Sequence, residues 1–172
     1  SQATLVTVTA GSERTGISAQ LTRAGSITGA VTDSSNYPLD DICVSAYDSS
    51  GFSNWNTKTD SDGTHELRNL TTGDFRVRFD DCGDNNVVGE YYANRQSLSN
   101  ATRVSVTNGT VTPGINATLS RGGSISGTVT DTSNQPLVGI CVRTWDSNGD
   151  RGPNGTTDAL GHYLIDGLDT DS

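Results

Sequence analysis

The chain has 172 residues, a formal net charge of −9 and a sequence pI near 4.4, and 31% of its residues are hydrophobic. Its 11 basic residues are dispersed, so it lacks the basic footprint that nucleic acid or an anionic membrane surface requires. No apolar run approaches the roughly 20 residues of a membrane-spanning helix. Gly, Ser, Thr, Asn and Asp are abundant, and no segment has helical periodicity. The composition therefore predicts an all-β protein with many turns.

The first 24 residues contain two alternating stretches, TLVTVT and ISAQLT, joined by AGSERTG. The same pattern returns further along the chain as RVSVT and INATLS. Alternation of apolar and polar residues is typical of half-buried strands. We therefore predict that residues 1–24 are the last two strands of a preceding repeat.

An internal repeat organises the rest of the chain. Residues 25–51 return without a gap as residues 123–149, at an offset of 98 residues. A period of one small domain indicates an array of domains rather than a solenoid. We predict a complete repeat over 25–122 and the first, incomplete part of the next repeat over 123–172. The seams LTRAG and LSRGG contain no flexible linker, which favours stiffly coupled neighbours.

Within residues 25–122, about seven strands are expected, as in a β-sandwich of ordinary size. Strands are predicted over 26–33 and 42–47, in the segment THELRNL, over 75–79, and around 103–107 and 115–120. A polar loop is expected over 48–62 and an irregular acidic stretch after residue 80. The inner face is predicted to contain Ile27, Val31, Ile42, Val44, Phe75, Val77, Phe79, Val104 and Val106. In the second copy, the corresponding face has Ile125, Val129, Ile140, Val142 and either Leu164 or Ile165.

Three segments of the second copy, 124–131, 136–142 and 157–168, read SISGTVTD, PLVGICV and TDALGHYLIDGL. They resemble the carboxypeptidase regulatory-like domain, and their first-copy equivalents do so too, with His65 in place of the family's aromatic residue. The resemblance implies tandem antiparallel β-sandwiches of transthyretin-like (prealbumin-like), Ig-like fold. Members of that family act as non-catalytic spacers, stalks and adhesion modules, either attached to secreted enzymes or in tandem on cell surfaces. A likeness of fold does not by itself determine function.

The three cysteines indicate one disulfide. Cys43 and Cys82 both lie on the outward side of their strands, and cysteines on the same face of adjacent strands can reach disulfide geometry. Free buried thiols and metal ligation are the alternatives. Cys141 repeats Cys43 one period later, and its partner is expected outside this chain. A disulfide would place the protein in an oxidising compartment.

Metal binding and catalysis have little support in the sequence. Residues 146–150 space oxygens as calcium loops do, but Arg151 and Thr157 occupy the sixth and twelfth positions, where Gly and an acid are needed. A solvated turn is the better interpretation, and weak calcium binding stays open. His65 and His162 occupy non-equivalent repeat positions, and no G-x-S-x-G motif is present. We expect no enzyme, no cofactor and no metal.

Two surface features bear on glycans. Trp55, Tyr91, Tyr92 and Trp145 are candidates for a sugar-stacking platform, with packing against a neighbouring domain or loop as the more frequent role of such residues. Five sequons are present, and none recurs at the equivalent place of the other copy, so they are weak evidence for glycosylation. The candidate glycosylation sites are Asn69, Asn100, Asn108, Asn116 and Asn154.

The sequence favours a structural, extracellular or cell-surface repeat protein that forms a stalk, fibre or filament. Its partners would be copies of itself or further repeats of the same chain, in head-to-tail order. Both ends are expected to be completed by protein outside this chain, by a longer polypeptide in preference to strand donation between subunits. The alternatives are an adhesin or carbohydrate-binding module, and a non-catalytic appendage of a secreted enzyme.

Overall fold

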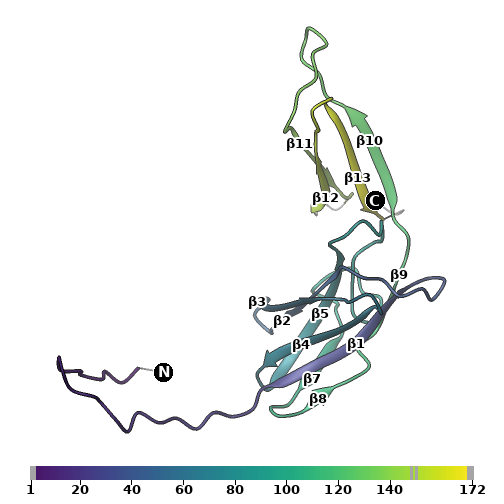
Figure 1. Ribbon diagram of the computed structural model, residues 1–172. Helices are drawn as coiled ribbons and strands as arrows, with labels where there is room; N and C mark the ends of the chain where they lie inside the picture. The colour runs from purple at the N-terminus through teal and green to yellow at the C-terminus, as the bar shows by residue number, and fades with distance from the viewer. Residues whose placement is uncertain (1–2, 148, 150, 170–172) are drawn as a thin grey trace.

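The computed structural model describes residues 3–147, 149 and 151–169. In this range it contains thirteen strands and no helix, and therefore no helix that could cross a membrane. We call residues 25–119 the main body and residues 123–168 the distal body (Figure 1). The strands of the main body are β1 (Gly25–Asp33), β2 (Ile42–Tyr47), β3 (Ser53–Lys58), β4 (Thr64–Leu70), β5 (Gly73–Asp81), β6 (Glu90–Tyr91), β7 (Arg103–Val106), β8 (Val111–Thr112) and β9 (Ala117–Leu119).

Two sheets enclose the core of the main body. In the first sheet, β1 pairs antiparallel with β4 on one edge and parallel with β8 and β9 on the other. The prediction of a purely antiparallel sandwich is therefore wrong for this sheet, which is mixed. The second sheet has the order β3-β2-β5-β6, and β7 also pairs with β5. Inward side chains of both sheets form one hydrophobic cluster. All nine predicted core residues of this body are buried, at 4% exposure or less.

The period of two along β2 and β5 explains this core. Ile42, Val44 and Ala46 are fully buried, whereas the residues between them are half-buried. Val44 lies opposite Phe79 in the antiparallel register. Because successive side chains of a strand point to opposite faces, one correct residue determines the register of the whole strand. The register predicted from the sequence is confirmed.

The polar loop predicted over 48–62 is wrong, because β3 occupies its centre. β3 has the sequence SNWNTK and pairs antiparallel with β2, from Cys43 opposite Lys58 to Tyr47 opposite Ser53. It lies at the edge of its sheet, and its residues alternate between half-buried and exposed. Polar edge strands are common because they discourage pairing with other chains, and they lack the apolar alternation by which strands are recognised.

The distal body contains β10 (Gly123–Thr128), β11 (Cys141–Trp145), β12 (Arg151–Thr156) and β13 (His162–Leu168). β10 pairs antiparallel with β13, and β11 pairs with β12. The β10–β13 register is the β1–β4 register moved by 98 residues: Gly123 lies opposite Leu168 as Gly25 lies opposite Leu70.

Direct hydrogen bonds join the two bodies. The backbone N–H of Gly122 donates to the carbonyl oxygen of Asn86 at 2.9 Å, and the N–H of Gly167 donates to Asn86 Oδ1 at 2.9 Å. A Cβ atom on Gly122 would lie 2.6 Å from the Cα atom of Gly167, so these two segments of the chain meet backbone to backbone. Asn86 thus anchors both the entry to β10 and the end of β13.

Residues 3–24 form an extended trace that leads away from the main body at the Gly25 end of β1 (Figure 1). No strand is assigned to them, and all are exposed. Within this segment, the N–H of Ser12 donates to the carbonyl oxygen of Thr9 in a turn. The two strands predicted over 1–24 are therefore not formed in the described residues 3–24. The assignment of residues 1–24 to a preceding repeat, and of 25–122 and 123–172 to separate repeats, stays a prediction.

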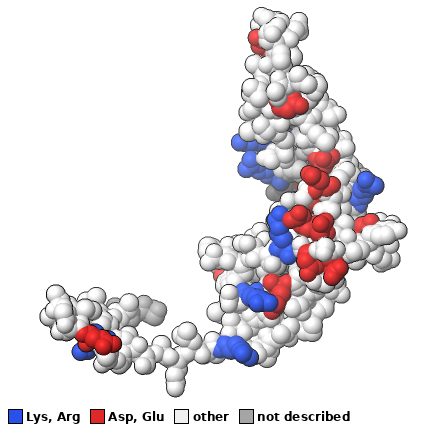
Figure 2. Space-filling view, viewed as in Figure 1, with Lys and Arg blue, Asp and Glu red and all other residues white. Residues whose placement is uncertain are grey.

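Acidic and basic side chains are mixed on the face shown in Figure 2. Acidic groups gather over the middle of the molecule, with basic groups between and around them. Such a surface presents no continuous basic field to a polyanion.

Candidate functional site

Cys43 and Cys82 form the disulfide expected from the sequence, with Cα atoms 5.6 Å apart. Cys43 lies opposite Asp80 in the β2–β5 register, so Cys82 is two residues further on the same face. The bond ties β2 to the segment that follows β5. Cys141 is exposed and takes part in no disulfide of the described residues, and its bond to a partner outside the chain stays a prediction.

The two histidines do not share a site. His65 of β4 is buried, its ring contacts Phe79 edge-on at 5.7 Å, and both of its ring nitrogens have no hydrogen-bond partner. Desolvation lowers the pKa of His65 from 6.5 to about 4. His162 is exposed, with Nδ1 4.0 Å from a carboxylate oxygen of Asp158. His65 therefore occupies the place of a core aromatic residue, as its position in the family motif suggests.

We expect the neutral state of His65 to make folding pH-dependent. Between pH 6.5 and about 4 the unfolded chain binds a proton at this histidine that the native state does not bind, so stability falls as the pH drops through this window. One such proton gives a slope of at most about 1.4 kcal/mol per pH unit. Urea unfolding at several pH values measures this slope.

A matched pair of variants tests whether His65 causes this pH dependence of stability. His65→Tyr introduces the residue found at the equivalent position of the distal body, Tyr163, and should flatten the profile between pH 6.5 and 4. His162→Gln should leave the profile unchanged because that side chain is exposed. An unchanged slope in His65→Tyr would contradict the assignment.

The aromatic platform proposed for sugars does not assemble from its four members. The Trp55 ring packs edge-on against Phe75 at 5.2 Å, and its Nε1–H donates to the carbonyl oxygen of Asn69. Tyr91 is buried under the Arg78 guanidinium, 5.0 Å from the ring centroid, and Tyr92 packs against the core. Trp145 is 58% exposed. Three of the four rings thus stabilise the main body.

The carboxylates mainly shape turns. Asp60 accepts hydrogen bonds from Thr64 Oγ1 and from the N–H groups of Asp62 and Thr64, and these bonds lower its pKa. Asp158 accepts N–H bonds from His162 and Leu160, which lower its pKa likewise. The described residues contain no group of three or more His, Cys, Asp or Glu that could hold a metal ion. The 146–150 segment lies partly outside the described residues, at 148 and 150.

All five sequon asparagines are exposed. The side-chain oxygen of Asn108 accepts from the N–H of Thr72, and that of Asn116 accepts from the N–H of Ala30. These bonds use the side-chain oxygen and not the amide nitrogen, the atom that carries an N-linked glycan. Glycosylation of Asn69, Asn100, Asn108, Asn116 and Asn154 stays a prediction.

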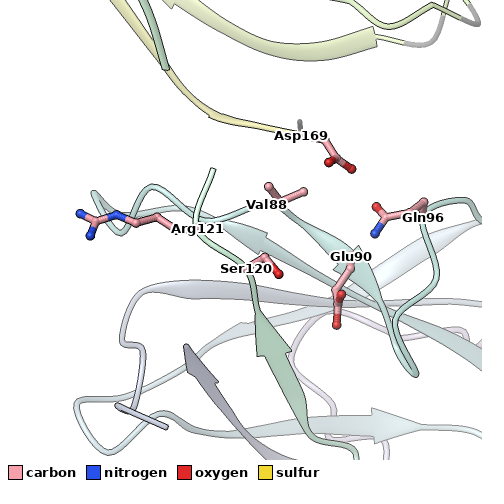
Figure 3. Close-up of a pocket in the computed structure, with 6 residues that line it drawn as sticks. All are labelled: Val88, Glu90, Gln96, Ser120, Arg121 and Asp169. Carbon is pink, nitrogen blue, oxygen red and sulfur yellow. The ribbon is translucent and has the colours of Figure 1, made fainter. Parts of the chain in front are cut away.

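A small cavity of about 140 Å³ lies where the two bodies meet (Figure 3). Glu90 on its wall is buried, one of its carboxylate oxygens has no hydrogen-bond partner, and desolvation raises its pKa. Figure 3 shows the Glu90 carboxylate and the Arg121 guanidinium pointing away from Asp169. These charged groups do not converge on one point, as a catalytic site would need. The cavity is lined by Val88, Glu90, Gln96, Ser120, Arg121 and Asp169.

The distal body exposes apolar residues whose main-body counterparts are buried. Ile125 is 48% exposed, whereas its main-body counterpart Ile27 is fully buried. Ile140 is 39% exposed, and its counterpart Ile42 is fully buried. Val129 and Val142 are half-buried. Exposed apolar surface marks interaction sites when it is larger than single scattered residues. We call this surface, with Ile125, Val129, Ile140 and Val142, the open face; Ile165 of the same body is buried and Leu164 is exposed.

The sequence belongs to a known domain family. Residues 26–120, more than half of the chain, match the model of the Carboxypeptidase regulatory-like domain. The chain is a member of this family. The match covers the main body from β1 to the residue after β9.

Two solved structures are similar to the chain at 16% sequence identity. The Bacillus anthracis TIE protein gives a TM-score of 0.44, with 81% of this chain and 26% of that protein covered. A streptococcal ancillary pilin gives a TM-score of 0.41, with 84% of this chain and 50% of the pilin covered. The chain thus spans about a quarter of the length of the TIE protein and half of the length of the pilin. No curated protein matches the chain.

Proposed function

We propose that this chain is a structural module of an extracellular or cell-surface protein, built of β-sandwich repeats that associate head to tail into a stalk, fibre or filament. The observation that carries the proposal is the open face: Ile125 and Ile140 are exposed, whereas Ile27 and Ile42 are fully buried. Burying apolar surface yields about 25 cal/mol per Å², so covering this face favours association. The covering protein is a second copy of the chain or a further repeat of it.

Two further features support this function. The Cys43–Cys82 disulfide suits an oxidising, extracellular environment. The hydrogen bonds of Asn86 to Gly122 and Gly167 couple successive bodies without a flexible linker, as a stiff stalk requires. The proposal assigns the chain no reaction and no cofactor.

An adhesin or carbohydrate-binding module is the second candidate. Its support is Trp145, whose ring is 58% exposed. Trp145 is the one member of the four-ring candidate platform that is exposed, and one ring offers less to a sugar than the open face offers to a protein. An appendage of a secreted enzyme is compatible with the same surface.

Negative-stain electron microscopy of the protein from its source tests the structural role. We expect fibres of uniform width. Isolated compact particles at every concentration would contradict the proposal and favour a binding module or an enzyme appendage.

A further inference from the structure

β10 has an open edge in the described part of the chain. It pairs with β13 on one side only. Its counterpart β1 pairs with β4 on the equivalent side and with β8 and β9 on the other. An unpaired strand edge presents a row of backbone donors and acceptors to another chain.

Residues 17–21 have the sequence ISAQL and correspond, at the 98-residue offset, to residues 115–119, INATL. Ile17 is 64% exposed and Leu21 is 92% exposed, whereas Ile115 and Leu119 are 5% and 0% exposed. Ala19 is exposed, whereas Ala117 is buried. The same apolar pattern is thus buried at residues 115–119 and exposed at residues 17–21.

We propose that residues 17–21 of a second copy of this chain add to the open edge of β10 as a parallel strand, in the register of β9 on β1. That register places Val31, Thr32 and Asp33 opposite Ala117, Thr118 and Leu119. Ala19, Gln20 and Leu21 of the second copy then lie opposite Val129, Thr130 and Asp131, the three residues that directly follow β10. This inference rests on the proposed function and specifies its contact.

The backbone of β10 is suited to this strand. In the main body, the N–H of Ile115 donates to the carbonyl oxygen of Thr28 at 3.1 Å, and a Cβ atom on Gly29 would lie 2.0 Å from the carbonyl oxygen of Ile115. Glycine is therefore required where the added segment passes closest. Gly127 stands at the equivalent place of β10, where a Cβ atom would lie 2.8 Å from the Tyr163 hydroxyl oxygen, much as one on Gly29 would lie 2.8 Å from a ring carbon of His65. Ser126 supplies the carbonyl oxygen equivalent to that of Thr28.

The donor cannot be the segment of the same chain. β9 runs parallel to β1 with Leu119 opposite Asp33, so the distal body begins near the Asp33 end of β1. The donor segment precedes β1 and joins it at the opposite, Gly25 end. The nine residues of β1 span about 30 Å. The four residues from Leu21 to Gly25 reach at most about 14 Å. A contact that passes from each copy to the next without closing gives an open filament.

The segment before the donor strand also has a place in this arrangement. Val6 and Val8 correspond to Val104 and Val106 of β7, which lie in the same core cluster as Ile27. Both are exposed here, at 44% and 68%. In the docked copy they come over the open face near Ile125, which explains why the apolar pattern continues upstream of residue 17.

Cysteine cross-linking tests the register. The hydroxyls of Thr32 and Thr118 lie 3.4 Å apart on the outer side of the main body, so Gln20→Cys of one copy and Thr130→Cys of another should form a disulfide. Both variants are made with Cys141→Ser and mixed before mild oxidation. We expect a cross-linked dimer of twice 18.0 kDa from the mixture and none from either variant alone.

Ser18→Cys mixed with Thr130→Cys is the off-register control and should cross-link at least tenfold less. Leu21→Asp should abolish assembly, whereas Gln20→Asp on the opposite side of the segment should preserve it. Leu21 is 92% exposed, so its replacement leaves the fold of one copy unchanged, which circular dichroism verifies. Assembly without the 20–130 cross-link would overturn this inference and leave the proposed function standing. A chain that stays monomeric would overturn both.

Discussion

Val44→Asp is expected to unfold the main body. The side chain is fully buried at the centre of the core, opposite Phe79. A carboxylate there would have no partner and no water, and burying an unpaired charge is one of the few changes that can cost more than about 4–5 kcal/mol. Domains of this size are stable by only about 5–15 kcal/mol. Circular dichroism and limited proteolysis of the purified variant measure the loss of structure.

Ser45→Asp is the matched control. Ser45 is the next residue of β2, it is only half-buried, and it points to the opposite side of the sheet. We expect the Ser45→Asp variant to fold, with a change in stability well below that of Val44→Asp. A folded Val44→Asp with native stability would contradict the register of β2 and β5.

Removing the disulfide should give the second largest effect. The bond closes a loop of 39 residues, and in the chain-entropy model such a bond stabilises by about 3–4 kcal/mol. The double variant Cys43→Ala/Cys82→Ala should therefore melt roughly 15–25 °C below the parent chain. Differential scanning calorimetry measures this shift.

Cys141→Ser controls for the loss of a thiol, and it should melt like the parent chain because Cys141 is exposed and outside the main body. Peptide mapping without reductant should recover Cys43 and Cys82 as one linked pair. Recovery of both as free thiols from fresh protein would contradict the disulfide and remove one support of the extracellular proposal.

Alternating apolar residues made much of the main body predictable from sequence. Ile42, Val44, Phe75 and Phe79 face inward because hydrophobic burial selects one face of a two-residue period. β3 could not be predicted because its sequence, SNWNTK, has little apolar content and its position comes from pairing with β2. Strand pairing is a tertiary interaction, and local propensity reports it poorly for edge strands.

The candidate site was predictable to a smaller degree. The disulfide between Cys43 and Cys82 was predictable because the alternation of side chains along each strand places both cysteines on the outward face of the sheet. The half-burial of Trp55 and the burial of Tyr91 were not predictable, since they depend on contacts with Phe75 and Arg78 of β5, which are formed only in the folded sheet. His65 had one usable signal: it stands where the family motif has an aromatic residue.

Mass measurement of the assembled 172-residue chain, first in native and then in denaturing, reducing solution, tests the central claim most directly. Head-to-tail association through the open face predicts native species at many multiples of 18.0 kDa that all fall to 18.0 kDa on denaturation. A single folded species of 18.0 kDa at every concentration in native solution would contradict it.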